Sequence, residues 1–151
     1  NNWVEGYIDW NLVLNEEGGP NHVGNYCDAP IIADTENDQV IFNSSYYYIG
    51  HFSKYIQENA LRIGLDHNNK NLQVTAFKNP DGSIVIIILN ETEQREYFEL
   101  KHNENSLKNE APKRSIQTII IDKGEKKKKK YQHYLISNNH LCFYFYQCIC
   151  R

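Results

Sequence analysis

The chain has 151 residues, with 16 Lys and Arg against 19 Asp and Glu and a formal net charge of −3. This average joins two unlike pieces: residues 1–122 carry 9 Lys and Arg against 18 Asp and Glu, whereas residues 123–151 carry 7 against 1. The six histidines show no metal-ligand spacing, so we expect no metal and no cofactor. The length is enough for one ordinary core, and the longest apolar run near the C-terminus is shorter than the about 20 residues of a membrane-spanning helix.

The N-terminal segment from Trp3 to Trp10 is mostly apolar, which predicts a strand. A polar loop containing Gly18-Gly19-Pro20 follows it. Asp9 and Trp10 therefore stand near the carboxyl end of the expected strand. In a (β/α)8 barrel, that end of each strand carries the active site.

A helix is expected next, because Ser44 or Ser45 can cap a segment whose apolar residues recur every three or four positions. These residues are Tyr48, Ile49, Phe52, Tyr55 and Ile56. After residue 59 the pattern changes to short strands, predicted at Leu61–Leu65, Leu72–Lys78, Ile84–Asn90, Glu96–Lys101 and Ser115–Asp122.

Two of the strand signals are particularly clear. The segment Asn79-Pro80-Asp81-Gly82 predicts a hairpin connection, because each of its residues favours turns. The strand that follows it is apolar at every position from Ile84 to Leu89, which predicts that both of its faces are covered.

Residues 123–151 differ from the rest in composition. The run Lys126–Lys130 could attract an anionic membrane or a nucleic acid, since each Lys near an anionic surface contributes about 1 kcal/mol. Translated AT-rich noncoding sequence would give the same mixture of Lys, Asn, Tyr, Phe and Ile, and we favour that interpretation. We therefore expect a disordered and non-native tail and no nucleic-acid partner.

The run from Asp9 to Asp28 resembles the last barrel strand and following loop of the lysosomal glucosylceramidases, glycoside hydrolase family thirty. Further motifs continue the resemblance in the family's order, so that it covers Trp3 to Asp122: Ala29–Ile32, Tyr46–Ile56, Asn79–Ser83 and Val85–Asn90. The resemblance implies an α/β plus all-β fold. Residues 1–58 would form the last strand and helix of a (β/α)8 TIM barrel, and residues 59–122 most of a β-sandwich whose other strands precede the barrel. Family members are much longer, so we expect this chain to be their C-terminal part.

The family's reaction is the retaining hydrolysis of glucosylceramide to glucose and ceramide. Retention needs two carboxyl groups about 5–5.5 Å apart. The resemblance places these glutamates on the fourth and seventh barrel strands, so no catalytic residue is expected in this chain. Glu16 and Glu17 are interpreted as solvated loop carboxylates.

Recognition of the sugar is the role that this chain could supply. Trp10 offers a flat face for the apolar side of a pyranose, and by resemblance it contacts glucose. Asn25 corresponds to a family residue that bonds a sugar hydroxyl, although an Asx turn explains it equally well. Asp9 matches an acidic position beside the pocket, where it would order neighbouring side chains or accept a sugar hydroxyl.

Two sequons, Asn43-Ser44-Ser45 and Asn90-Glu91-Thr92, predict glycans of a secretory-route protein. The resemblance implies a lysosomal enzyme that contacts membranes peripherally, with a saposin-like activator as a further partner. Two alternatives stay open: a relative that cleaves another β-glucoside or a β-xyloside, and a non-catalytic carbohydrate-binding or structural β-domain.

Overall fold

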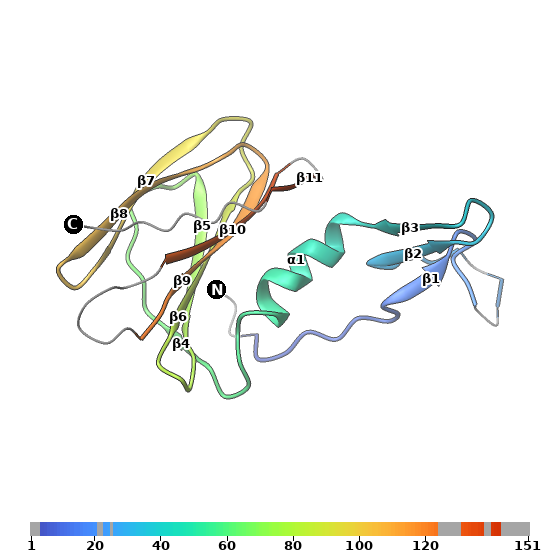
Figure 1. The fold of residues 1–151 in the computed structure, drawn as a ribbon, viewed down its shortest axis with the longest axis horizontal. Helices are drawn as coiled ribbons and strands as arrows, with labels where there is room; N and C mark the ends of the chain where they lie inside the picture. Colours follow the sequence, from blue (N-terminus) through green and yellow to red (C-terminus); the bar gives the residue numbers. More distant parts are fainter. Residues whose placement is uncertain (1–3, 21–22, 25, 124–130, 138–139, 143–151) are drawn as a thin grey trace. The chain divides into compact units, whose positions relative to one another are not determined.

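The computed structural model describes residues 4–20, 23–24, 26–123, 131–137 and 140–142 (Figure 1). The chain forms two compact units, residues 1–50 and residues 51–151. No helix among the described residues is long and apolar enough to cross a membrane.

The first unit contains a three-stranded sheet in the order β1-β2-β3, formed by Val13–Asn15, Ile31–Asp34 and Gln39–Phe42. The first two strands are parallel and the last two antiparallel. A small cluster of Leu14, Ala29 and Ile32 lies against the sheet, with Cys27 packed on it. The long connection from β1 to β2, residues 16–30, therefore returns beside the strand that it left.

The expected strand from Trp3 to Trp10 is wrong over residues 4–10, which form no strand. A parallel barrel strand needs hydrogen-bonded neighbours, and no described residue pairs with this segment. The hairpin of β2 and β3 was not predicted. Its signal was present, because two short apolar runs flank the polar turn at residues 35–38.

Helix α1 runs from Ser44 to Ser53, so Ser44 and Ser45 lie inside its first turn and the residue at the cap position is Asn43, whose carbonyl accepts from the Tyr46 N–H at 3.1 Å. A further backbone bond, from the Ile56 amide to the Phe52 carbonyl, continues the turn beyond the last helical residue. In the second unit, His51 at the end of the helix is buried, and its Nδ1 lies 2.7 Å from the hydroxyl of buried Thr118.

The second unit is a two-layer β structure (Figure 1). One layer is a six-stranded antiparallel sheet in the order β11-β10-β9-β6-β5-β4, and the other is the hairpin β7–β8. The sheet strands are β4 (Leu61–Ile63), β5 (Leu72–Lys78), β6 (Ile84–Asn90), β9 (Ser115–Ile121), β10 (Tyr131–Ser137) and β11 (His140–Cys142). The hairpin strands are β7 (Glu96–His102) and β8 (Asn105–Ala111).

Strand β6 is covered on both faces, as its uninterrupted apolar sequence predicts. Ile86 and Ile88 belong to the main core, which the hairpin covers with Phe98, Leu100 and Leu107. Val85 and Ile87 point to the opposite face, where Tyr55 and Ile56 pack. Each fully buried aliphatic side chain of this kind contributes about 1.5–3 kcal/mol, so the two clusters account for much of the unit's stability.

Two parts of this unit differ from the sequence-based expectation. Strand β8 was missed, because its sequence Asn-Ser-Leu-Lys-Asn-Glu-Ala has little β-propensity; it forms by pairing with β7 across the turn at Asn103, whose φ is 55°. The tail expected to be disordered contains β10 and β11. Seven residues of β10 pair with β9, from Tyr131 opposite Ile121 to Ser137 opposite Ser115, so the open edge of β9 supplies a partner that charge and composition do not reveal.

Asn90, a predicted glycan acceptor, lies at the end of β6 with 0% of its surface exposed. Its Nδ2, the atom that would carry the glycan, lies 2.8–2.9 Å from the carbonyl oxygens of Gln94, Ala111 and Pro112. Its Oδ1 accepts hydrogen bonds from the backbone N–H and the hydroxyl of Thr92. The predicted glycan on Asn90 is therefore incompatible with this fold, because the sequon is a buried structural motif.

Replacing Asn90 by Ala should destabilise the whole protein by about 2–3 kcal/mol, because it leaves buried carbonyl groups without a donor. Urea-induced unfolding measures this change. Asn105→Ala, at an exposed Asn of the same unit that does not line the groove, is the matched control and should change stability by less than about 0.5 kcal/mol. Equal stability of the two variants would contradict the structural role of Asn90.

Candidate functional site

Asp9 and Trp10 lie together in the first unit. Asp9 Oδ1 accepts a hydrogen bond from the backbone N–H of Trp10 at 2.8 Å, and Asp9 Oδ2 accepts one from the Tyr7 hydroxyl at 3.0 Å. The Trp10 side chain is open to solvent, with 82% of the residue's surface exposed. Asp9 thus contacts both Tyr7 and Trp10, and the Trp10 side chain is exposed.

Tyr7 was not singled out from the sequence. It stands two positions before Asp9, and residues two apart in an extended segment point to the same side. Its hydrogen bond to Asp9, together with the nearby negative charge, raises the pKa of Tyr7 above its usual range. The phenol therefore remains a protonated donor to Asp9.

The connection from β1 to β2 is tied down at its start by Asn15. The backbone N–H of Asn15 donates to the Gly19 carbonyl at 2.7 Å, and its side-chain Oδ1 accepts from the Gly19 N–H at 2.6 Å. Gly18 has a φ of +73°, and a Cβ on it would lie 2.4 Å from the backbone nitrogen of Cys27. The turn at Gly18 is therefore packed directly on the returning part of the same loop.

A carboxylate joins this loop to the hairpin. Glu16 accepts two hydrogen bonds from Thr35, from the backbone N–H at 2.8 Å and from the hydroxyl at 2.7 Å. These bonds, the backbone one foremost, hold the pKa of the Glu16 carboxyl below its usual range. The lowered pKa agrees with the expected loop carboxylate, and the two hydrogen bonds to Thr35 add a contact that the sequence did not predict.

The far end of the loop is held by Asp28 and Asn43. Asn43 Nδ2 lies 2.9 Å from Asp28 Oδ1 and 2.7 Å from the Ala29 carbonyl oxygen, and both atoms accept from it. A glycan on Asn43 would replace one of these two hydrogens. The third residue expected to contact a sugar, Asn25, lies outside the described residues.

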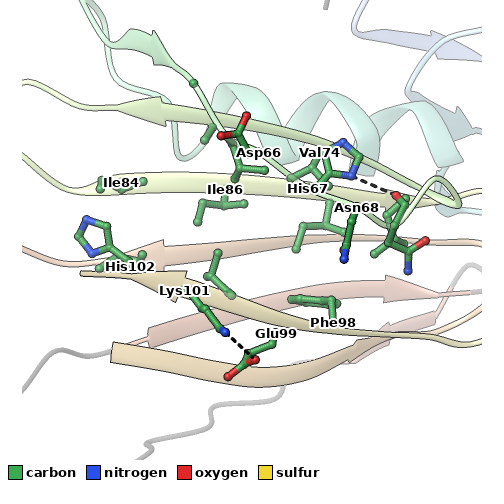
Figure 2. A pocket seen from close by; sticks show the side chains of 18 of the residues that line it. Asp66, His67, Asn68, Val74, Ile84, Ile86, Phe98, Glu99, Lys101 and His102 are labelled. Carbon is green, nitrogen blue, oxygen red and sulfur yellow. Dashed lines mark hydrogen bonds and ion pairs between the residues drawn. The ribbon is translucent and has the colours of Figure 1, made fainter. Parts of the chain in front are cut away.

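The second unit contains a separate groove of about 840 Å³ between the large sheet and β7. Figure 2 shows Ile84 and Ile86 on the sheet and Phe98, Glu99 and Lys101 on β7 at opposite sides of it. The floor is aliphatic, whereas the rim is polar and includes Asp66, His67, Asn68, Glu99, Lys101 and His102. The Nδ1 atom of His102 is buried without a hydrogen-bond partner among the described residues.

The structure brings together only part of the predicted site. Asp9 and Trp10 are adjacent and hydrogen-bonded. No group of three or more His, Cys, Asp or Glu side chains in the described part of the chain could hold a metal ion. The Glu16–Thr35 contact was missed, because 19 residues separate the two partners.

Comparison with known proteins gives two family matches. The TIM-barrel domain of glycosyl hydrolase family 30 matches residues 1–56, and the β-sandwich domain of the same family matches residues 59–119. These matches confirm the expected fold class, the end of a TIM barrel followed by a β-sandwich.

Two curated relatives of the chain are named as glucosylceramidases. The lysosomal acid glucosylceramidase of Mus musculus is 44% identical over 92 residues, and putative glucosylceramidase 1 of Caenorhabditis elegans is 46% identical over 92 residues. Each match covers 60% of this chain and 18% of the relative, so the chain spans less than a fifth of the length of these proteins.

Two solved structures are also similar. SrfJ from Salmonella typhimurium gives a TM-score of 0.71 at 36% identity and covers 78% of this chain and 26% of its own. An endo-β1,6-glucanase gives a TM-score of 0.69 at 27% identity and covers 76% and 26%.

Gly18 provides a test of the loop's packing. Gly18→Ala should cost about 1–3 kcal/mol more than Gly24→Ala, because both positions have a left-handed φ but only Gly18 meets backbone atoms. Thermal and urea unfolding of the two variants in the whole protein measure the difference. Equal losses would show that the contact between Gly18 and Cys27 does not constrain the loop.

Proposed function

Because the chain belongs to glycosyl hydrolase family 30, we propose that the protein is a retaining β-glucosidase acting on glucosylceramide, and that this chain supplies part of its sugar-binding site. The observation that carries the proposal is the exposed indole of Trp10 beside the ordered carboxylate of Asp9. The relatives named as glucosylceramidases support the choice of substrate.

The chemistry of the Asp9–Trp10 pair suits a pyranose. The flat face of Trp10 covers the apolar C–H side of the ring, and the indole N–H can donate to a hydroxyl. Asp9 already accepts from Tyr7 and from the Trp10 backbone, so its main role is to orient Trp10. Asn25 remains a proposed hydrogen-bonding partner of the sugar.

The bond-breaking step needs two carboxyl groups on either side of the glycosidic bond. One protonates the leaving oxygen, and the other attacks the anomeric carbon. By family resemblance both belong to barrel strands outside this chain, so the described residues position the sugar and break no bond.

A second candidate is the hydrolysis of a different β-glucoside or a β-xyloside. Similarity to an endo-β1,6-glucanase favours it over unrelated chemistries. Turnover of glucosylceramide compared with that of short β-glucans and β-xylosides by the whole protein distinguishes the two. A non-catalytic carbohydrate-binding domain is the further alternative for the second unit, whose groove is lined by the aromatic side chains of Tyr97 and Phe98 beside its aliphatic floor.

A separate proposal concerns how the groove of the second unit is completed. Among the described residues β7 pairs only with β8, and β4 forms one edge of the large sheet. A two-stranded layer alone is marginally stable. We propose that a further strand of the intact protein closes the groove and covers the floor residues and His102.

The same resemblance underlies the proposed partners and location. We propose a glycolipid substrate at a membrane surface, peripheral membrane contact, a saposin-like activator and a lysosomal or secretory-route location. Asn43 remains the candidate glycan acceptor in the described part of the chain.

Trp10→Ala should lower kcat/KM for a fluorogenic β-glucoside roughly 10- to 100-fold, equivalent to about 1.4–2.7 kcal/mol of lost transition-state binding. Trp10→Phe retains a flat ring and should recover much of this loss. Steady-state kinetics of the whole protein measure both. A folded Trp10→Ala variant with unchanged kcat/KM would assign Trp10 to packing.

Residues 1–122 expressed alone should hydrolyse no β-glucoside, because the two reacting carboxyl groups are proposed to lie elsewhere. A fluorogenic assay against a buffer blank tests this. Turnover that a retaining-glucosidase inhibitor abolishes would place a catalytic pair within these residues.

A further inference from the structure

We propose that the edge of β9 is a strand-binding surface that strands β10 and β11 of the same chain occupy, and that a second copy of the chain pairs there when they are removed. These two strands pair with each other antiparallel and are called the edge hairpin below. Their role in covering β9 is independent of the proposed sugar binding at Trp10.

The sequence of β9 suits pairing with any strand that reaches its edge. Ser115–Ile121 reads Ser-Ile-Gln-Thr-Ile-Ile-Ile, which contains no charged residue, no Pro and no Gly. Segments of this length and composition have high β-propensity and add further strands readily. A long hydrophobic strand at an open sheet edge therefore promotes association between copies of a protein.

The rest of the second unit holds β9 in place. Ile119 and Ile121 belong to the main core, whereas Ile116 belongs to the cluster on the opposite face. Strand β6 pairs with all seven residues of β9 along one edge. The other edge is therefore a preformed row of backbone donors and acceptors, which binds a further strand at little cost in ordering entropy.

The edge hairpin matches this row residue for residue. All seven residues of β10 pair with β9 in one continuous antiparallel register, from Tyr131 opposite Ile121 to Ser137 opposite Ser115. Figure 1 shows β10 beside β9. In an antiparallel pair, alternate residues direct their N–H and C=O groups to the same neighbour, so about half of the backbone groups of β9 depend on β10.

The edge hairpin also leaves a poorer edge than the one that it covers. The outermost strand of the sheet, β11, has three residues and pairs only with residues 135–137 in the described part of the chain. Natural sheets discourage edge-to-edge pairing with very short edge strands and with Lys. Five consecutive lysines, residues 126–130, directly precede β10 in the sequence. The long apolar edge of β9 is thus replaced by one that is ill suited to a second copy.

Truncation of the whole protein tests this role. A stop codon after Lys123 removes the edge hairpin, whereas a stop codon after Cys142 removes only residues 143–151 and is the matched control. The first variant should self-associate with a Kd at least about 10-fold lower than that of the parent, because a few backbone hydrogen bonds become available to a second copy. The control should match the parent. Sedimentation velocity over a range of concentrations measures both.

Hydrogen exchange identifies the surface that the copies use. In the parent, the amides of β9 should all exchange slowly, since β6 and β10 together engage them. In the monomer of the variant truncated after Lys123, alternate amides of β9 should lose this protection. They should regain it in the associated form.

Two proline variants of the full chain decide the question if the truncated protein folds poorly. His133 and Tyr134 are neighbours in β10 that pair with β9 and not with β11. Successive residues of a strand direct their N–H groups to opposite sides, so only one of the two donates to β9. Proline lacks the N–H and is tolerated where that side of the strand is open. One of His133→Pro and Tyr134→Pro should therefore raise both self-association and exchange in β9, and the other should not.

Three results would overturn the proposal. Equal self-association of the two truncated proteins would attribute it to the loss of residues 143–151. A variant truncated after Lys123 that stays monomeric with β9 fully protected would show that another segment covers this edge. Two proline variants that both match the parent would show that β10 does not hold it.

Discussion

The second unit depends on one constraint: every side chain from Ile84 to Leu89 needs cover, and a strand has two faces. Strands β5 and β9 satisfy the backbone on either side of β6, but they cannot cover its faces. The hairpin β7–β8 covers one face, and residues 55–56 cover the other. The layered form of the unit follows from this single apolar run.

The hairpin β7–β8 does not cover the whole face of the large sheet. The groove beside β7 shows that the hairpin is narrower than the sheet beneath it. The polar rim residues keep the opening compatible with water, while the aliphatic floor gains by further burial. The same imbalance occurs in the first unit, where Trp10 and several other large apolar side chains are exposed. In both units, apolar surface remains available for association.

Sequence patterns predicted the parts of the fold that local information determines. The bounds of β5 and β6 were predicted to the residue, because apolar periodicity and the Asn-Pro-Asp-Gly turn agree there. The segment from Trp3 to Trp10 is also rich in apolar residues, yet residues 4–10 form no strand, since a strand also needs partners. Strand β8 shows the converse: its partner β7 compensates for weak propensity.

The contacts of the candidate site could likewise be predicted from the sequence only where they are local. Asp9 and Trp10 are neighbours in sequence, and their hydrogen bond is local. The Glu16–Thr35 contact spans 19 residues and depends on a hairpin that had not been predicted. Asn90 shows the limit most directly, because a three-residue sequon contains no information about whether its amide nitrogen is already engaged in the core.

The buried pair of His51 and Thr118 has a consequence for the register of the helix end on its sheet. An all-apolar contact would tolerate a slip, because one methyl group can replace another at little cost. The Thr118 hydroxyl, on a strand position opposite Ile87, and the His51 imidazole tolerate such an exchange poorly, since a slip would place each of them against hydrocarbon. The hydrogen bond between His51 and Thr118 therefore favours one alignment of residues 51–56 over β6 and β9.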